Sequence, residues 1–332
     1  MNDIGKERWL ALGETMGWVQ GDAPPVPLPG IAIANRAALD AALAGATGGE
    51  IFRLADDDFG SLEIKRQWAD PVTIIGGTFG SVKLGTPHWK ARGKGVVLQH
   101  VKATYLEAKA FDAATFLHCE AEQLLIESAD GATVERCWLH DGHFPLRLLR
   151  ATNFRVIGNI MERAREDTMR ISGDSHDGEV RGNVFLDNRA AKPMHGDHLQ
   201  IFGLPKEATG PKHIVIEQNL MHDDATDKEV TVLATGRAGT AAPAQGVFIG
   251  DGAGDFTDFS IRHNLIRLSM VNAIAAKSAP ERFTVAENIV LPVKGFNVAR
   301  IRFGKHDDQP HWTPRGATVS RNVTTMIEDS SG

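Results

Sequence analysis

The feature that most constrains this chain is a five-residue pattern that recurs through its second half. Each copy has an apolar residue, two variable residues, asparagine and a second apolar residue, as in VIGNI, VRGNV, IEQNL, IRHNL, VAENI and VSRNV. A further copy, VERCW, carries Cys137 where the others carry asparagine. The asparagines of these copies are Asn159, Asn183, Asn219, Asn264, Asn288 and Asn322.

The spacing of the copies predicts the fold. Cys137, Asn159 and Asn183 follow one another at intervals of 22 and 24 residues, and longer intervals indicate the same unit with an inserted loop. Apolar and polar residues alternate within each unit, which is typical of strands. Such a unit cannot bury its own apolar face, so neighbouring units must stack into a solenoid. We therefore predict an all-β fold, a single-stranded parallel β-helix with about three short strands per coil and coils about 4.8 Å apart.

The repeated asparagine has a structural explanation. Asparagine tolerates left-handed backbone angles in tight turns, and its side-chain amide can satisfy backbone groups. In stacked coils these amides would form a hydrogen-bonded ladder, so we assign the column a structural role. We expect Cys119 and Cys137 to be buried thiols in the same stack.

The chain divides into an arm and one domain. Residues 1–33 are interpreted as a short helical arm with a Pro-rich linker, and residues 34–332 as the β-helix domain. Asn35 is a good helix N-cap, a capping helix is predicted over about 35–46, and the glycines at 48 and 49 end it. Coils then extend from about 49 to 327. A helix over the open end is the usual cap of a solenoid, and we expect the arm to contact a partner protein.

Composition narrows the function classes. The formal net charge of −6 argues against a nucleic-acid binder, which would carry a basic face. Two cysteines are too few for a disulfide scaffold. The N-terminus has no signal-peptide pattern, and no apolar run approaches the roughly 20 residues that cross a bilayer, so no membrane insertion is expected. We expect a protein that stays in the cytoplasm, where it is made, or belongs to a virion or phage-like particle.

The capping helix and the asparagine-punctuated coils carry a family resemblance. From about residue 34 to 327 the chain resembles the pectate-lyase-like family of right-handed parallel β-helix proteins. The segment DTMRISG, followed one coil later by GDHLQIFG, resembles β-helix proteins of bacteria and their phages that act on polysaccharides. The catalytic signatures of pectate lyases and polygalacturonases are not intact here. The resemblance therefore implies a right-handed β-helix and a polysaccharide partner, rather than a particular reaction.

A second strand can be aligned after each asparagine. Asp167 and Asp197 then fall in one column on adjacent coils, and Arg147, Arg170 and Gln200 fall in a second, outward-facing column. The apolar residues used for the alignment, all expected to point into the core, are Leu146, Met169, Leu199 and Phe248.

Further polar residues and two long insertions lie close to these columns in the sequence. Glu166, His195 and His143 lie just ahead of the aligned strands, at the turn. The insertions at 203–212 and 223–245 are long for a compact repeat, and such loops are often functional. We expect them to rise as walls beside the columns and to form a groove for a carbohydrate chain.

The groove residues allow two kinds of cleavage. In a glycoside hydrolase, Asp167 and Asp197 would be the acid and the base. In a lyase acting on a uronate polymer, the same two carboxylates could hold Ca²⁺, with Arg170 or His198 removing the proton and Arg147 neutralising the carboxylate. No cofactor other than this optional Ca²⁺ is implied. The other substrate-binding residues predicted are Gln200, His195, Glu166 and His143.

Three alternatives stay open. The stretch HGDH at 195–198 resembles part of a metallo-hydrolase pattern but lacks its leading histidine, which argues against zinc. A non-catalytic receptor-binding spike or fibre of a phage-like particle could grip a polysaccharide through the same groove. It could do so as a homotrimer attached to virion proteins by the arm. Finally, Asp167 and Asp197 could be turn residues that cap local backbone groups.

Overall fold

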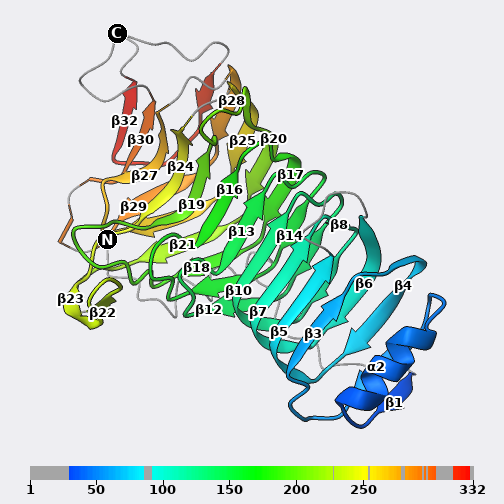
Figure 1. Ribbon diagram of the computed structural model, residues 1–332. Helices are drawn as coiled ribbons and strands as arrows, with labels where there is room; N and C mark the ends of the chain where they lie inside the picture. The colour runs from blue at the N-terminus through cyan, green and yellow to red at the C-terminus, as the bar shows by residue number, and fades with distance from the viewer. Residues whose placement is uncertain are drawn as a thin grey trace.

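The computed structural model describes residues 30–85, 92–226, 228–252, 255–277, 281–293, 295–296, 298–303 and 317–329. Their strands wind into stacked parallel coils along one axis, with the helix α2 (Arg36–Gly45) at the end where the coils begin (Figure 1). The predicted right-handed parallel β-helix is confirmed. Of residues 1–33, predicted to be an arm and linker, residues 1–29 lie outside the described residues, and Ile31–Ile33 instead form a strand that pairs with the coils. No helix among those described is long and apolar enough to cross a membrane.

One long parallel sheet, here called the back sheet, contributes a strand to each coil. Short β8 (Phe111–Asp112) pairs beside it with β6. In stacking order the back-sheet strands are β1 (Ile31–Ile33), β2 (Ile51–Leu54), β4 (Gln67–Ile75), β6 (Gly93–Gln99), β9 (Thr115–Leu117), β11 (Thr133–Glu135), β14 (Arg155–Ile157), β17 (His176–Arg181), β20 (Thr209–Glu217), β25 (Asp255–Arg262), β28 (Glu281–Ala286) and β31 (Thr318–Ser320).

The other strands of each coil form two further rows. The first coils supply single strands, β3 (Ser61–Ile64), β5 (Thr78–Gly85), β7 (Lys102–Lys109) and β10 (Glu120–Glu127). The flank row follows each asparagine turn: β12 (Trp138–His140), β15 (Ile160–Glu162), β18 (Val184–Leu186), β21 (Leu220–Asp223), β26 (Leu265–Leu268) and β29 (Ile289–Pro292). The front row follows it: β13 (Leu146–Leu149), β16 (Met169–Ser172), β19 (Asp197–Phe202), β24 (Gln245–Asp251), β27 (Asn272–Ala276), β30 (Arg300–Phe303) and β32 (Met326–Asp329).

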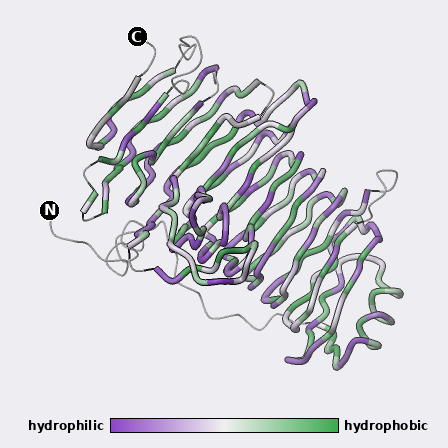
Figure 2. Tube along the Cα trace, turned by 60° about the vertical axis from the view of Figure 1, so that its left-hand side comes forward, coloured by the Kyte–Doolittle hydropathy of each residue, from purple (hydrophilic) through white to green (hydrophobic). Residues whose placement is uncertain are grey.

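The core fills the inside of the coils. Hydrophobic and hydrophilic residues alternate along the chain in Figure 2, as strands with one buried face require. In the front row, Leu146, Met169 and Leu199 stack from coil to coil and are completely buried. Burying one such side chain contributes roughly 1.5–3 kcal/mol. Both predicted thiols, Cys119 and Cys137, are buried and free.

The capping helix forms where the sequence predicts it. The Asn35 side chain accepts a hydrogen bond from the Ala38 N–H at 3.0 Å, which satisfies one of the open donors of the first turn. Leu39 and Leu43 are buried against the core at that end of the solenoid. Arg66 donates to the Leu43 carbonyl oxygen at 2.7 Å, near the C-terminus of the helix.

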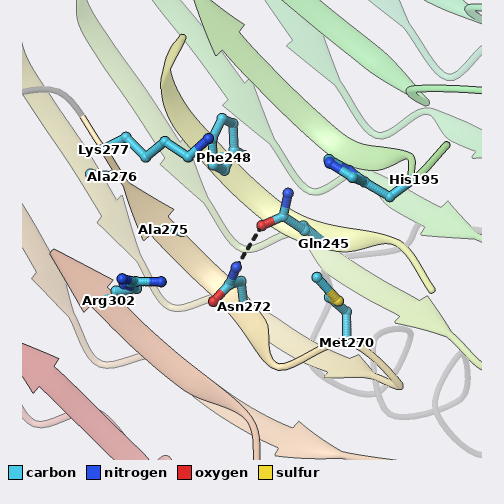
Figure 3. Close-up of a pocket in the computed structure, with 9 residues that line it drawn as sticks. All are labelled: His195, Gln245, Phe248, Met270, Asn272, Ala275, Ala276, Lys277 and Arg302. Carbon is cyan, nitrogen blue, oxygen red and sulfur yellow. Dashed lines mark hydrogen bonds between the residues drawn. The ribbon is translucent and has the colours of Figure 1, made fainter. Parts of the chain in front are cut away.

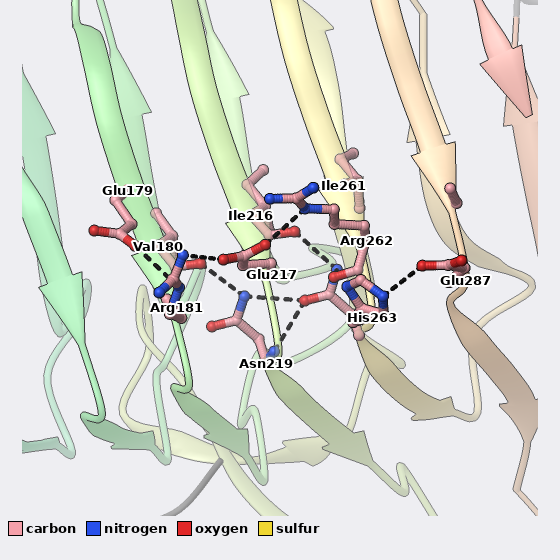
Figure 4. Close-up of polar contacts among 12 residues, drawn as sticks. Glu179, Val180, Arg181, Ile216, Glu217, Asn219, Ile261, Arg262, His263 and Glu287 are labelled. Carbon is pink, nitrogen blue, oxygen red and sulfur yellow. Dashed lines mark hydrogen bonds and ion pairs between the residues drawn. The ribbon is translucent and has the colours of Figure 1, made fainter. Parts of the chain in front are cut away.

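The asparagine ladder is confirmed. The Asn219 Nδ2 donates to the Asn264 Oδ1 at 3.0 Å and to the Val180 carbonyl oxygen at 2.9 Å, and the Asn219 N–H donates to the same Oδ1 at 3.0 Å (Figure 4). Cys137 ends the ladder, because its N–H donates to the Asn159 Oδ1 at 2.8 Å. Ion pairs run beside the ladder on the protein surface. In one of them the Arg262 Nε lies 2.6 Å from the Glu217 Oε2 (Figure 4).

The backbone angles of this turn differ from the expectation. The left-handed residue is the one before each asparagine, such as Gln218 with φ 56° or His263 with φ 56°, and not the asparagine itself. That bend turns the following asparagine inward, where its amide meets the next coil. The residue type before it is free to vary because its side chain faces away from the ladder.

Replacing one rung of the ladder tests its contribution. Asn219→Ala removes the acceptor of two buried donors on Asn183, each of which costs about 1–3 kcal/mol when left unsatisfied. We expect the free energy of unfolding, measured by urea titration, to fall by at least about 2 kcal/mol. Asn322→Ala, at the partly exposed end of the ladder, should cost less because water can replace the lost amide. Equal losses at both positions would contradict this account.

Candidate functional site

Five polar side chains stack where the front-row strands begin. The Asp197 N–H donates to the Asp167 Oδ1 at 2.8 Å, and the Gln245 Nε2 donates to the Asp197 Oδ1 at 2.9 Å. The Asn272 Nδ2 donates to the Gln245 Oε1 at 2.9 Å, and the Arg300 Nε to the Asn272 Oδ1 at 2.9 Å. We call these five residues the outer ladder. It confirms that Asp167 and Asp197 share one column on adjacent coils.

Asp167 is held tightly within the protein. It is 2% exposed, and burial raises the pKa of its carboxyl group, an effect that Arg170 opposes by donating from Nε to Oδ2 at 2.5 Å. The Arg170 Nη2 also donates to the Glu166 Oε1 at 2.7 Å, and the Glu166 Oε2 lies 2.6 Å from the His143 Nε2. The structure thus brings four predicted residues together. Both oxygens of Asp167 already accept hydrogen bonds from the protein.

The second predicted column is present in the register. Arg147 pairs with Arg170, and Arg170 pairs with Gln200, on three successive front-row strands. All three side chains are half-buried on the outward face. The Arg170 guanidinium lies 3.7 Å from the centroid of the Phe144 ring, which fixes its position. These residues form a basic strip along the front row.

The fourth aligned strand was placed one residue out of register. Val247, rather than Phe248, pairs with Leu199 and occupies the core, and Phe248 pairs with Gln200 in the outward column. Because Val247, Phe248 and Ile249 are all apolar, alternation could not distinguish the two registers.

His198 does not face the groove, and the prediction that it acts there is wrong. Its side chain is fully buried, with its ring centroid 6.1 Å from that of Phe185 and its Nδ1 3.4 Å from the Thr168 Oγ1. Burial lowers its pKa to about 3, so the ring is neutral at pH 7. The strand bends where it begins, which leaves His195 exposed and turns His198 inward. Gly196 allows this bend, since a Cβ there would lie 2.5 Å from the Glu166 carbonyl oxygen.

A pocket of about 140 Å³ opens on the front row beside the outer ladder (Figure 3). It is smaller than the roughly 300–1,000 Å³ typical of pockets for drug-sized ligands, so it suits one monosaccharide unit. Its described lining includes two cations, an imidazole and two amides, and no carboxylate. The Lys277 Nζ lies 4.8 Å from the centroid of the Phe248 ring. The lining residues are His195, Gln245, Phe248, Met270, Asn272, Ala275, Ala276, Lys277 and Arg302.

His195 and Asp197 form a pair at the edge of the pocket. The His195 side chain is 56% exposed, whereas that of Asp197 is fully buried. The His195 Nδ1 lies 3.8 Å from the Asp197 Oδ1, which is an ion-pair distance and longer than a hydrogen bond. The exposed ring can therefore meet a ligand while a buried carboxylate lies near one of its nitrogens.

A buried ion pair holds the insertion at 223–245 beside the pocket. Lys228 pairs with Asp223, whose pKa is raised by burial, and its Nζ donates to the Asn188 carbonyl oxygen at 2.9 Å. The Asp223 Oδ2 accepts from the Ala244 N–H at 3.2 Å, directly before the pocket residue Gln245. This contact links the start of the insertion at 223–245 to the start of β24.

The two long insertions lie in different places. The segment 223–245 contains an antiparallel hairpin, β22 (Glu229–Val232) and β23 (Arg237–Thr240), and pairs through Ala241 with Ala191 in the loop that leads to His195. The segment 203–212 follows the other end of β19, where Glu207 pairs with Arg150. Only the first insertion therefore borders the pocket. The prediction that both flank the aspartates is wrong for the second.

The structure places both aspartates that were predicted as possible calcium ligands in hydrogen bonds to the protein. Among the residues that it describes, no group of three or more histidine, cysteine or acidic side chains is arranged to hold a metal ion. Asp167 gives both oxygens to protein donors, and the Asp197 Oδ1 accepts from Gln245. The two aspartates are members of the outer ladder. Asp167 accepts a hydrogen bond from the Asp197 N–H, which resembles the predicted alternative in which these aspartates cap local backbone groups.

Several pocket residues were missed from the sequence. Gln245 and Asn272 continue the column of Asp197, and Arg302 continues the column of Gln200 through Phe248. Extending the strand alignment by two coils would have found them, but the insertions interrupt the repeat there. Lys277 comes from the residue just after β27 and has no sequence signal.

The buried His198 should make stability depend on pH. The unfolded chain takes up a proton near the ordinary pKa of 6.5, but folded His198 does so only near 3, so the unfolded state binds more protons between these values. Stability therefore falls as pH falls, by about 2 kcal/mol between pH 7 and pH 5 for this one group. Urea titrations of His198→Gln should show a shallower loss over that range. An unchanged slope in His198→Gln would refute the assignment.

Comparison with known proteins finds similar solved structures at low sequence identity. No family model matches the sequence, and no curated protein matches it. The chain is similar to pectate lyase Pel9A, with 15% identity, 87% of this chain and 73% of that chain covered, and a TM-score of 0.45. It is also similar to an alginate lyase from Paenibacillus sp. str. FPU-7, with 12% identity, 88% of this chain and 97% of that chain covered, and a TM-score of 0.40. A third similar structure is the A-module of mannuronan C-5 epimerase AlgE6 from Azotobacter vinelandii. Its identity is 13%, 87% of this chain and 93% of that chain are covered, and the TM-score is 0.42.

Proposed function

We propose that this protein is a polysaccharide-degrading enzyme that cleaves an acidic polysaccharide by β-elimination at the front-row pocket. The observation that carries the proposal is the lining of that pocket. Lys277 and Arg302 supply positive charge, the exposed His195 stands beside the buried Asp197, and none of the described residues that line the space is a carboxylate. Such a lining suits a sugar that itself carries a carboxylate.

Glycoside hydrolysis fits the site less well. That reaction needs two carboxyl groups that face the scissile bond from either side, about 5–9.5 Å apart. The predicted pair, Asp167 and Asp197, is 2% and 0% exposed and is engaged in the outer ladder. A substrate cannot reach either carboxylate without breaking that ladder.

Recognition would combine charge with an aromatic surface. Arg302 and Lys277 pair with the sugar carboxylate, and the amides of Gln245 and Asn272 bind its hydroxyl groups. Neighbouring sugar units extend along the front row over the basic strip of Arg170 and Arg147. The same cations stabilise the charge that develops on the carboxylate when the adjacent proton leaves.

His195 is the base in this proposal. Its imidazole removes the proton on the carbon next to the carboxylate, and the buried Asp197 stabilises the imidazolium that forms. The electron pair of that C–H bond forms a carbon–carbon double bond as the glycosidic C–O bond breaks. The departing oxygen takes a proton from water, and the new chain end is an unsaturated uronate.

A time course on purified polymers tests the function. Alginate-like, pectin-like and bacterial exopolysaccharides are incubated with the protein, and reducing ends are recorded together with the ultraviolet band of an unsaturated uronate. We expect both signals to rise together on an acidic polymer. Reducing ends without the band would mean hydrolysis, and retention on a polymer column without either signal would mean binding only. Both of these results would overturn the proposed reaction.

The base can be tested by substitution. His195→Ala should lower kcat by roughly 10²–10⁴ with little change in KM, because general base catalysis contributes about that much. A matched control is His213→Ala, which removes a half-exposed histidine from the back sheet and should leave kcat unchanged. Retention of full activity by His195→Ala would refute the role of this residue.

The charge requirement has its own test. Lys277→Met and Arg302→Met each remove a charged partner of the carboxylate, and such a contact is worth about 1.5–3 kcal/mol, or roughly ten- to hundredfold in affinity. We expect the KM of each variant to rise by that factor on the acidic polymer. On a carboxyl-reduced polymer, wild type and the variants should bind with the same affinity. Lys94→Met on the back sheet is the control. An equal affinity of wild type for the reduced and the acidic polymer would contradict the proposal.

A further inference from the structure

The two arginines of the basic strip differ in how far the protein already balances their charge. Arg170 donates to the Asp167 Oδ2 at 2.5 Å and to the Glu166 Oε1 at 2.7 Å, so two carboxylates face its guanidinium. No described residue forms a hydrogen bond or an ion pair with the Arg147 side chain, and its Nε is buried without a hydrogen-bond partner. The Phe144 ring lies beside it, with its centroid 5.7 Å from the guanidinium carbon. Arg147 thus keeps a charge that the described residues do not neutralise.

Such a guanidinium is a binding position for an anion. Leaving a charged donor buried without an acceptor is unfavourable, and a ligand oxygen at this position would remove that cost. The Arg147 side chain is half-buried on the outward face of β13, so the rest of its guanidinium is within reach of a ligand. The planar group matches a carboxylate through two parallel hydrogen bonds. Arg147 therefore fits a sugar carboxylate better than a neutral hydroxyl group.

Arg147 lies some distance from the cations of the pocket. Strand register places Arg170, Gln200 and Phe248 on the next three coils of the same outward column. Phe248 lines the pocket, and the Lys277 Nζ lies 4.8 Å from its ring centroid. Three coil spacings of about 4.8 Å separate Arg147 from Phe248, or about 14 Å in all. A ligand that fills the pocket, which suits one monosaccharide unit, reaches Arg147 only if it is a longer chain.

Among the described residues, the stretch between these two positions offers no uncommitted cation. Gln200 carries an amide, and Arg170 is balanced by Asp167 and by Glu166, whose side chain is 20% exposed. A ligand carboxylate above this stretch would lose water and face the like charge of Glu166 without gaining a new partner, which is unfavourable. Ligand carboxylates are therefore favoured at the two ends of the stretch and disfavoured within it.

We propose that the pocket and Arg147 are two separate carboxylate subsites about 14 Å apart, and that the polymer bound along the front row is a heteropolysaccharide whose uronate units are separated by neutral sugars. A polymer charged at every unit would turn some of its carboxylates toward Gln200 and Glu166. The formal net charge of −6 also repels a densely charged polyanion more than a sparsely charged one. This inference rests on the proposed function in one respect, because it takes the ligand of the pocket to be a sugar carboxylate.

A graded set of polymers tests the spacing of charge. The carboxyl groups of alginate and of polygalacturonate are reduced to primary alcohols in increasing fractions, which converts uronates into neutral sugars and leaves the linkages unchanged. Affinity is measured by calorimetry with His195→Ala, so that the polymer is not consumed. We expect the affinity to be highest at intermediate reduction and lowest at complete reduction. An affinity that falls from the first step of reduction in both polymers would overturn the proposal.

Substitution of Arg147 in the same His195→Ala background tests the second subsite. On the partly reduced polymer that binds best, Arg147→Met should weaken binding roughly ten- to hundredfold, which is the effect of losing a hydrogen bond to a charged group. Galacturonate, a monosaccharide that fills only the pocket, should bind with unchanged affinity because Arg147 is out of its reach. Arg147→Lys keeps the charge and should retain most of the affinity. Arg155→Met removes an exposed charge from the back sheet and is the control.

The outcomes separate this inference from the proposed reaction. Because equilibrium binding is measured, the spacing of the subsites is tested whether or not the bound polymer is cleaved. A time course without the band of an unsaturated uronate would refute the reaction alone. An affinity for the polymer that Arg147→Met leaves unchanged, or equal losses on the polymer and on galacturonate, would overturn the second subsite.

Discussion

Backbone hydrogen bonds between successive coils hold every other feature of this protein in place. They pair strands in register from coil to coil, so that each residue in one coil has a fixed partner in the next. A side chain is therefore placed by its position within the repeat, and equivalent positions form columns about 4.8 Å apart. Such close stacking penalises unpaired polar groups and like charges, and each polar column must resolve that penalty in its own way.

Two polar columns show two solutions. The inner one uses asparagine alone, because an amide both donates and accepts, and each rung satisfies the next. The outer ladder mixes residue types: two aspartates, which only accept when ionised, are followed by Gln245 and Asn272, and the column ends with the cation Arg300. Charge changes from negative to positive along its length. The pocket opens at the amide segment, where neither sign of charge dominates the ladder itself.

The sequence was sufficient to predict the coils, the capping helix and the asparagine ladder, because these depend on periodic patterns and local caps. It was also sufficient to align Asp167 with Asp197 and Arg147 with Arg170, where adjacent coils differ little in length. The prediction failed at His198, because the direction of a side chain at a bend depends on neighbouring backbone, here around Gly196. Arg302 was missed because the insertions interrupt the repeat before it, and Lys277 was missed because it follows its strand without a sequence signal.

Burial decides which residues of the site can act. The carboxylates that first suggested acid–base chemistry lie beneath the surface, where removing them from their donors would leave buried charges unpaired and cost several kcal/mol. The polar groups of the described residues that line the pocket are cationic, amide or imidazole. Under the proposed function, such a site stabilises negative charge on its ligand and uses its own buried carboxylate only to support the exposed imidazole. Charge on the substrate, rather than a pair of catalytic acids, is then the property to which this surface is complementary.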